Sequence, residues 1–221
     1  MAEQRVILRE DVLALAQWVM AHPLIRENFA LGGGTWLTLR NPRQARTSTD
    51  IDVFSPKEEV SSYRAMRELV QTCEKDKIGH RVERRGEHFC QIYVEYPTAG
   101  KPIKVDIGKI WRPLSVLIDP DLQLPVLSPE DMAVEKMRCI VNRIEPTDIH
   151  DLCVLHECYP EAFRVACEDL KRTLETHELV AAINRRLEVI NVEGTKLALT
   201  DQELQWMTGK IRTVVAEIIR T

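Results

Sequence analysis

The segment from Leu31 to Phe54 constrains the fold of this chain more than any other part of it. A glycine turn, Gly33-Gly34-Thr35, is followed about fifteen residues later by Asp50-Ile51-Asp52-Val53-Phe54. Successive side chains of a β-strand point to opposite faces, so the two aspartates are predicted to share one face and the apolar residues the other. Adjacent carboxylates repel each other unless a cation lies between them, and such hard oxygen ligands suit Mg²⁺ or Mn²⁺. The segment therefore predicts a metal site beside a turn.

The glycine turn itself is predicted to bind phosphate. Phe29-Ala30-Leu31 can form a short strand that enters the turn, and a helix is predicted to begin near Thr35. Backbone N–H groups at the start of a helix attract anions, and glycine lets a phosphate approach without a clash with Cβ. Gly33, Gly34 and Thr35 are therefore candidate nucleotide-binding residues.

A third acidic position follows in a group of predicted strands. A helix is predicted over residues 58–74. The strands cover residues 78–84, 89–96 and 103–107. Turn-like segments between them favour an antiparallel arrangement. In the last strand, Val105-Asp106-Ile107 again places an acid between two apolar residues. Asp106 is therefore a candidate third metal ligand, and could also act as a general base.

The second half of the chain has helical periodicity. Residues 113–125 hold three prolines and predict a connection across the surface. Ser128-Pro129-Glu130-Asp131 then has an N-cap serine, a proline in the first turn and an acid at the third helical position. Breaks are predicted near residues 145–146, 159–160 and 191–200. The fold class is therefore α+β: an α/β domain with a mixed, largely antiparallel sheet over residues 1–127, followed by an α-helical domain over residues 128–221.

Composition excludes several classes of protein. The 221 residues are 44% hydrophobic and 29% charged, which is an ordinary balance for a soluble globular protein. No apolar run approaches the roughly 20 residues of a membrane span, and the N-terminus lacks the apolar stretch of a signal peptide, so a cytoplasmic protein without a membrane partner is expected. The six cysteines form no CxxC pair and are predicted to be reduced thiols rather than zinc ligands. A net charge of −4 argues against a generally basic surface, though not against a local basic patch.

The candidate residues suit nucleotidyl transfer from a nucleoside triphosphate. That reaction needs positioning and charge neutralisation: metal ions bridge the phosphate oxygens, carboxylates hold the metals, and backbone amides or a lysine hold the phosphates. Asp50, Asp52 and Asp106 would supply the carboxylates. The expected cofactor is Mg²⁺ or Mn²⁺, with an NTP as the donor substrate.

Four segments together resemble a known family. Leu31 to Leu37 and Asp50 to Phe54 look like the nucleotidyltransferase signature of the AbiEii/AbiGii toxin family, within the DNA polymerase β-like nucleotidyltransferase superfamily. Ser128 to Arg138, followed by Asp148 to Leu152, resembles that family's helical lysine and downstream aspartate. The resemblance implies a nucleotidyltransferase-type α/β domain and a Mg²⁺-dependent enzyme. It also implies a toxin of abortive-infection or type IV toxin–antitoxin systems, which adds nucleotides to tRNA and has an antitoxin partner.

The resemblance also implies roles for single residues. By this resemblance, Gly33 and Gly34 bind phosphate, and Asp50 and Asp52 bind the metal. Lys136 contacts the triphosphate. The late acid falls on Asp151 or on Asp148, because both stand on one short helix. Plainer interpretations stay open, since Lys136 could pair on a solvated helix face and the two acids could charge a helix N-terminus. His150, between the acids, is interpreted as structural.

The sequence leaves the acceptor open. Arg40, Arg43 and Arg46 border the predicted phosphate site, and they either attract the triphosphate or an RNA, or are merely solvated. The resemblance implies tRNA as the acceptor, whereas the acidic net charge is compatible with a small molecule such as an antibiotic. A further hypothesis is a non-catalytic nucleotide-binding module.

Overall fold

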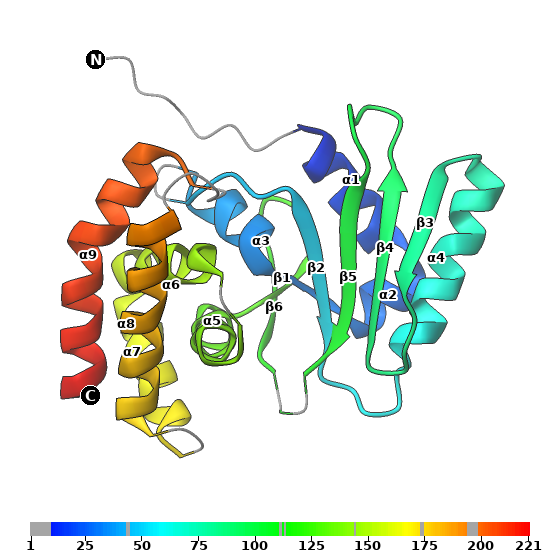
Figure 1. The fold of residues 1–221 in the computed structure, drawn as a ribbon. Helices are drawn as coiled ribbons and strands as arrows, with labels where there is room; N and C mark the ends of the chain where they lie inside the picture. The colour runs from blue at the N-terminus through cyan, green and yellow to red at the C-terminus, as the bar shows by residue number, and fades with distance from the viewer. Residues whose placement is uncertain are drawn as a thin grey trace. The chain divides into compact units, whose positions relative to one another are not determined.

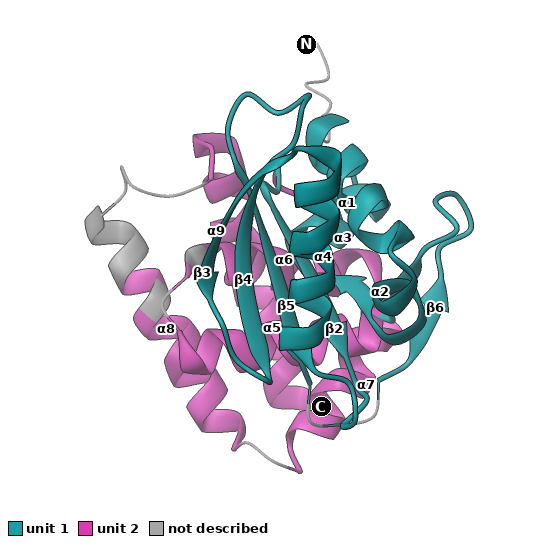
Figure 2. Cartoon of the chain, turned by 90° about the vertical axis from the view of Figure 1, so that its right-hand side faces the viewer, with its two compact units in different colours: residues 1–43, 47–128 teal, residues 44–46, 129–221 magenta. Residues whose placement is uncertain are grey.

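The computed structural model (Figure 1) describes residues 10–42, 45–110, 112, 114–143, 145–172, 175–193 and 199–221. It divides into two compact units, shown in different colours in Figure 2: unit 1 comprises residues 1–43 and 47–128, and unit 2 residues 44–46 and 129–221. The predicted boundary after residue 127 lies next to the division after Ser128. That the units are separate domains stays a prediction.

Unit 1 is built on a mixed sheet. Its described strands are β1 (Ala30–Gly32), β2 (Asp50–Ser55), β3 (Gly79–Arg84), β4 (Phe89–Glu95), β5 (Ile103–Lys109), β6 (Val116–Ile118) and β7 (Pro125–Leu127). Their order is β3-β4-β5-β2-β1-β7-β6. Strand β2 pairs parallel with β5, and β1 with β7, while the other neighbours are antiparallel. The prediction of a mixed, largely antiparallel sheet is therefore confirmed.

Helices cover this sheet. They are α1 (Glu10–Ala21), α2 (Pro23–Asn28), α3 (Gly33–Arg40) and α4 (Ser62–Asp76). Helices α1, α2 and α4 lie on one face of the sheet (Figures 1 and 2). Helix α4 was predicted to begin at Glu58 but begins at Ser62. The hydroxyl of Ser61 accepts a hydrogen bond from the N–H of Arg64 and so caps the helix at this point.

The segment predicted as a surface connection contains a strand. Residues 116–118 form β6, which pairs antiparallel with β7, and the side chains of this edge strand are exposed. Buried Asp119 closes the turn, because its carboxylate accepts the N–H groups of Asp121 and Leu122. Arg40 pairs with Asp119 at 3.3 Å. A strand of three residues is too short to show an alternating pattern, so the sequence did not reveal it.

Unit 2 is helical in its described part. Its helices are α5 (Pro129–Asn142), α6 (Pro146–Cys158), α7 (Pro160–Leu170), α8 (Thr176–Glu193) and α9 (Asp201–Arg220). The predicted breaks near residues 145 and 159 are confirmed, and a proline opens the helix that follows each of them. The third predicted break falls partly outside the described residues, and a capping box between Thr200 and Glu203 starts α9. No helix in the described ranges is long and apolar enough to span a membrane.

Candidate active site

Strand β2 carries the first two predicted site residues. Its burial alternates, so that Ile51 and Val53 are fully buried while Asp50 and Asp52 are only partly covered. The period of two along a strand places both carboxylates on the face opposite the buried pair. The predicted sharing of one face by the two aspartates is therefore confirmed.

Asp106 joins the same face from the neighbouring strand. In the parallel pair of β2 and β5, Asp52 stands opposite Asp106. The Gln91 side chain on β4 donates a hydrogen bond of 2.8 Å from Nε2 to Oδ1 of Asp106. Asp106 is almost buried, so this bond fixes the direction of its carboxylate. The structure thus brings three predicted carboxylates onto one face of two adjacent strands.

The glycine turn lies against this acidic face. Gly33 has a φ of +66°, and a Cβ on it would overlap the carboxylate of Asp52. Helix α3 begins at Gly33 rather than near Thr35, so its first-turn N–H groups belong to Gly33 and Gly34. The buried hydroxyl of Thr35 donates to the backbone carbonyl of Asp50, which ties the start of α3 to the start of β2. A residue with a side chain would not fit at position 33.

Lys104 is a member of this cluster that sequence reasoning missed. Its Nζ lies 3.0 Å from Asp50 Oδ2 and 3.3 Å from Asp106 Oδ2. Burial lowers the pKa of this lysine, but the two carboxylates outweigh burial and hold the pKa above its usual value. The signal was present in the sequence, because Lys104 precedes Asp106 by two residues and so shares its face.

The carboxylates fit a divalent cation by their chemistry. Asp50, Asp52 and Asp106 offer only hard oxygen donors, which Mg²⁺ and Mn²⁺ prefer. Among the described residues, however, no three His, Cys, Asp or Glu side chains are arranged to hold a metal ion. Two of the three carboxylates are instead turned towards the ammonium of Lys104.

The remaining predicted residues form a buried ion network in unit 2. Lys136 Nζ lies 3.0 Å from Asp148 and 2.6 Å from Asp151. Arg46 donates two hydrogen bonds of 3.0 Å to the two oxygens of Asp151. Arg143 donates two bonds, of 2.8 and 2.9 Å, to Asp148. Both candidate late acids therefore contact the same lysine.

Burial and charge together set the protonation of this network. Burial alone would raise the pKa of the Asp151 carboxyl, but Arg46 and Lys136 lower it far below its usual range. The pKa of Lys136 is raised, because Asp151 and Asp148 outweigh the effect of burial. The side chain of Lys136 is only 8% exposed, so the interpretation that it pairs on a solvated helix face is wrong.

Arg40, the last residue of α3, and Arg46, in the loop before β2, are both paired with carboxylates rather than free to bind a phosphate. Arg46 is bound to Asp151, and Arg40 to Asp119 and Asp121. Arg43 lies outside the described residues. The pairing of Arg46 with Asp151 links positions 105 residues apart, and no local pattern in the sequence indicates it. His150 is buried and packs on the ring of Trp206, with ring centroids 5.1 Å apart.

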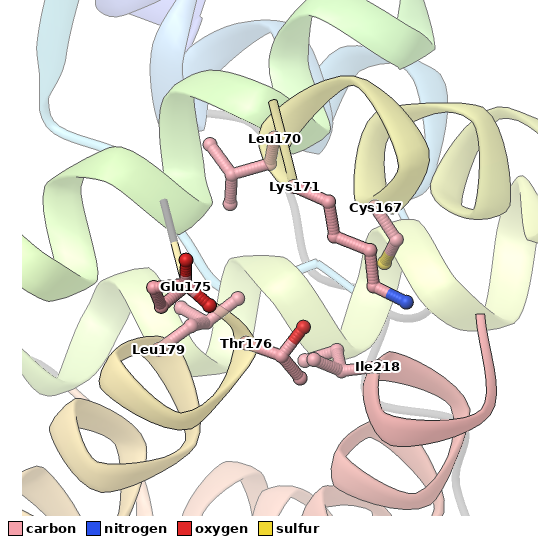
Figure 3. Close-up of a pocket in the computed structure, with 7 residues that line it drawn as sticks. All are labelled: Cys167, Leu170, Lys171, Glu175, Thr176, Leu179 and Ile218. Atoms are coloured by element: carbon pink, nitrogen blue, oxygen red, sulfur yellow. The ribbon is translucent and has the colours of Figure 1, made fainter. Parts of the chain in front are cut away.

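A small cavity in unit 2 is not a nucleotide site. Figure 3 shows its lining, which comes from Cys167, Leu170, Lys171, Glu175, Thr176, Leu179 and Ile218. A volume of about 10 Å³ has room for no more than a water molecule. Burial raises the pKa of Cys167 to about 12, which keeps this thiol protonated.

Solved structures of low sequence identity share this fold. JHP933 from Helicobacter pylori is 15% identical with a TM-score of 0.56, over 97% of this chain and 96% of that one. A further H. pylori protein, assigned as a nucleotidyltransferase, is 14% identical with a TM-score of 0.54, over 94% of this chain and 97% of that one. Megavirus polyadenylate synthase is 17% identical with a TM-score of 0.49, over 68% of this chain and 32% of its own length. The two H. pylori structures, whose TM-scores exceed 0.5, show that this chain has a nucleotidyltransferase-type fold.

A family model identifies the kind of nucleotidyltransferase. Residues 14–214 match the model described as nucleotidyl transferase AbiEii toxin, type IV toxin–antitoxin system. The chain belongs to this AbiEii family, and it is a nucleotidyltransferase enzyme. No curated protein sequence matches the chain. The resemblance inferred from the glycine turn and the acidic strand is confirmed.

We expect Gly33→Ala to destabilise unit 1. The new Cβ would overlap the Asp52 carboxylate, and a φ of +66° is strained for alanine, so a loss of about 2 kcal/mol is expected in urea unfolding. Gly100→Ala is the control, because a Cβ there meets no atom within 4 Å. Equal stability of the two variants would contradict the close packing of Gly33 on Asp52.

We expect Asp151→Asn to destabilise the protein by about 3 kcal/mol, because it removes the buried negative charge that both Arg46 and Lys136 contact. Glu161→Gln, which breaks an exposed pair with Arg164, should cost no more than about 1 kcal/mol. Urea unfolding measures both variants, and a similar cost for the two would refute the buried network.

We also expect the network to make folding sensitive to acid. A folded-state pKa below the unfolded value of about 3.9 means that the stabilisation by Asp151 is complete above that pH and is lost as the pH falls towards the folded-state pKa. Unfolding free energies measured at steps below about pH 4 should therefore fall less steeply for Asp151→Asn than for the wild type. Parallel slopes would show that Asp151 carries no depressed pKa.

Proposed function

We propose that this enzyme transfers a nucleotidyl group from an NTP to a hydroxyl of tRNA, with Mg²⁺ as its metal, as the toxin of a type IV toxin–antitoxin pair. The observation that carries the proposal is the convergence of Asp50, Asp52 and Asp106 on one sheet face beside the N-terminus of α3. Family membership supports the reaction class and an antitoxin partner. The cytoplasmic location stays a prediction.

Each group of the acidic face and the glycine turn is proposed to have its own role in the reaction. Gly33 and Gly34 present first-turn N–H groups that would hold the phosphates. Asp50, Asp52 and Asp106 would hold the divalent cation, which when bound supplies neutralising charge and lowers the pKa of the attacking hydroxyl. Asp106, whose carboxylate Gln91 orients, would also accept the proton from that hydroxyl.

In unit 2, Lys136 is proposed to contact the triphosphate. Asp148 and Asp151 both bind its ammonium and keep it charged, so they would act by holding the lysine in one position. Arg46 and Arg143 in turn hold the two acids. We therefore propose that Asp148 and Asp151 position Lys136 together, since both contact its ammonium.

The acceptor can be identified by incorporation of label. The protein is incubated with each labelled NTP and Mg²⁺, together with either total RNA or a panel of aminoglycosides. Label on tRNA-sized RNA is expected. Label only on an aminoglycoside would replace the proposed acceptor by a small molecule, and binding of NTP without any labelled product would favour a non-catalytic nucleotide-binding module.

We expect Asp52→Asn to reduce transfer by at least about a hundredfold, because the loss of one ligand charge removes several kcal/mol of transition-state stabilisation. Asp121→Asn is the matched control, since this aspartate is 85% exposed and belongs to the β6–β7 turn. Circular dichroism of both variants checks the fold. Wild-type turnover by Asp52→Asn would exclude a role of Asp52 in metal binding.

A further inference from the structure

Lys104 on β5 belongs to a group of four charged side chains that β2 and β5 bring together. In the register of these strands, Asp50 stands opposite Lys104, and Asp52 opposite Asp106. Register partners on adjacent strands point to the same side of a sheet, so all four groups share one face. The Nζ atom of Lys104 lies 3.0 Å from Oδ2 of Asp50 and 3.3 Å from Oδ2 of Asp106.

This contact differs from an ordinary surface ion pair. The Lys104 side chain is 26% exposed, and Asp106 is nearly buried, so solvent screens the pair only in part. The ammonium and a divalent cation would need the same oxygens of Asp50 and Asp106. Because two cations repel each other at such short range, both cannot occupy the space between these carboxylates.

We propose that Lys104 is a built-in competitor of the metal: it neutralises Asp50 and Asp106 in the nucleotide-free enzyme and must be displaced when a divalent cation binds there. The inference rests on the proposed function, because it takes these carboxylates as metal ligands. Lys104 then sets the metal affinity of the free protein, and it makes binding of metal alone weak. A metal ion that binds together with a triphosphate brings phosphate oxygens with it. These oxygens can accept hydrogen bonds from the displaced ammonium of Lys104.

Direct metal binding tests the proposal without any turnover. Mn²⁺ is titrated into the nucleotide-free full chain, and free Mn²⁺ is followed by electron paramagnetic resonance. We expect Lys104→Met to bind Mn²⁺ at least about tenfold more tightly than the wild type, because the competing charge is gone. Lys104→Arg keeps the charge and should stay within about threefold of the wild type.

Two controls make the outcome specific. Lys101→Met removes an exposed lysine just before β5 and should leave the Mn²⁺ affinity unchanged. Asp52→Asn should weaken Mn²⁺ binding in both the wild-type and the Lys104→Met background, which locates the ion at the strand carboxylates. If Lys104→Met yields little folded protein, Lys104→Gln replaces it, and the rise of its melting temperature with Mn²⁺ should exceed that of the wild type.

The outcomes separate this inference from the proposed function. Equal Mn²⁺ affinity of the wild type and Lys104→Met, with binding lost in Asp52→Asn, would overturn the role of Lys104 and leave the metal site standing. Weaker NTP binding by Lys104→Met with unchanged Mn²⁺ affinity would make Lys104 a phosphate ligand and also overturn the proposal. Mn²⁺ binding that Asp52→Asn does not alter would overturn both.

Discussion

The parallel pairing of β2 with β5 is the constraint on which the acidic face depends. Asp50 and Asp52 share a face by the alternation of one strand, but only the register between the strands brings Asp106 opposite Asp52. Buried Ile51 and Val53 hold this register, because a slip by one residue would turn them towards the acidic face and bury the carboxylates. The hydrophobic core therefore sets the position of the carboxylates on the opposite face of the strand.

The glycine turn depends on the same register. Strand β1 pairs antiparallel with β2, so that Gly32 stands opposite Asp52 and Gly33 follows directly. The chain can turn into α3 at this point only because Gly33 carries no Cβ to meet the Asp52 carboxylate. Backbone pairing of β1 with β2 thus brings the first-turn N–H groups of α3 next to the acidic face. The hydrogen bond from the Thr35 hydroxyl to the Asp50 carbonyl strengthens this link.

Local patterns explain what could be predicted from the sequence. The acidic strand was recognisable because acidic and apolar residues alternate over four consecutive residues, from Asp50 to Val53. The helical half was recognisable from its periodicity and its prolines. The pairing of Arg46 with Asp151 was not recognisable, since it depends on tertiary structure between distant segments. Lys104 was overlooked for another reason: a lysine on a strand face is ordinary until the register shows which carboxylates stand opposite.

The two lysine-centred clusters differ in their charge balance, and this difference separates their roles. In unit 2, Lys136 and two arginines meet two carboxylates that are buried, so every negative charge has a cation at hydrogen-bond distance. On the sheet of unit 1, Lys104 contacts Asp50 and Asp106, and Asp52 lies on the same face, opposite Asp106. Partly exposed carboxylates that share one sheet face suit a divalent ion, whereas two buried carboxylates that already bind three cations resist one. Metal chemistry is therefore expected at the acidic strands, and the network around Lys136 is suited to holding a single cation in place.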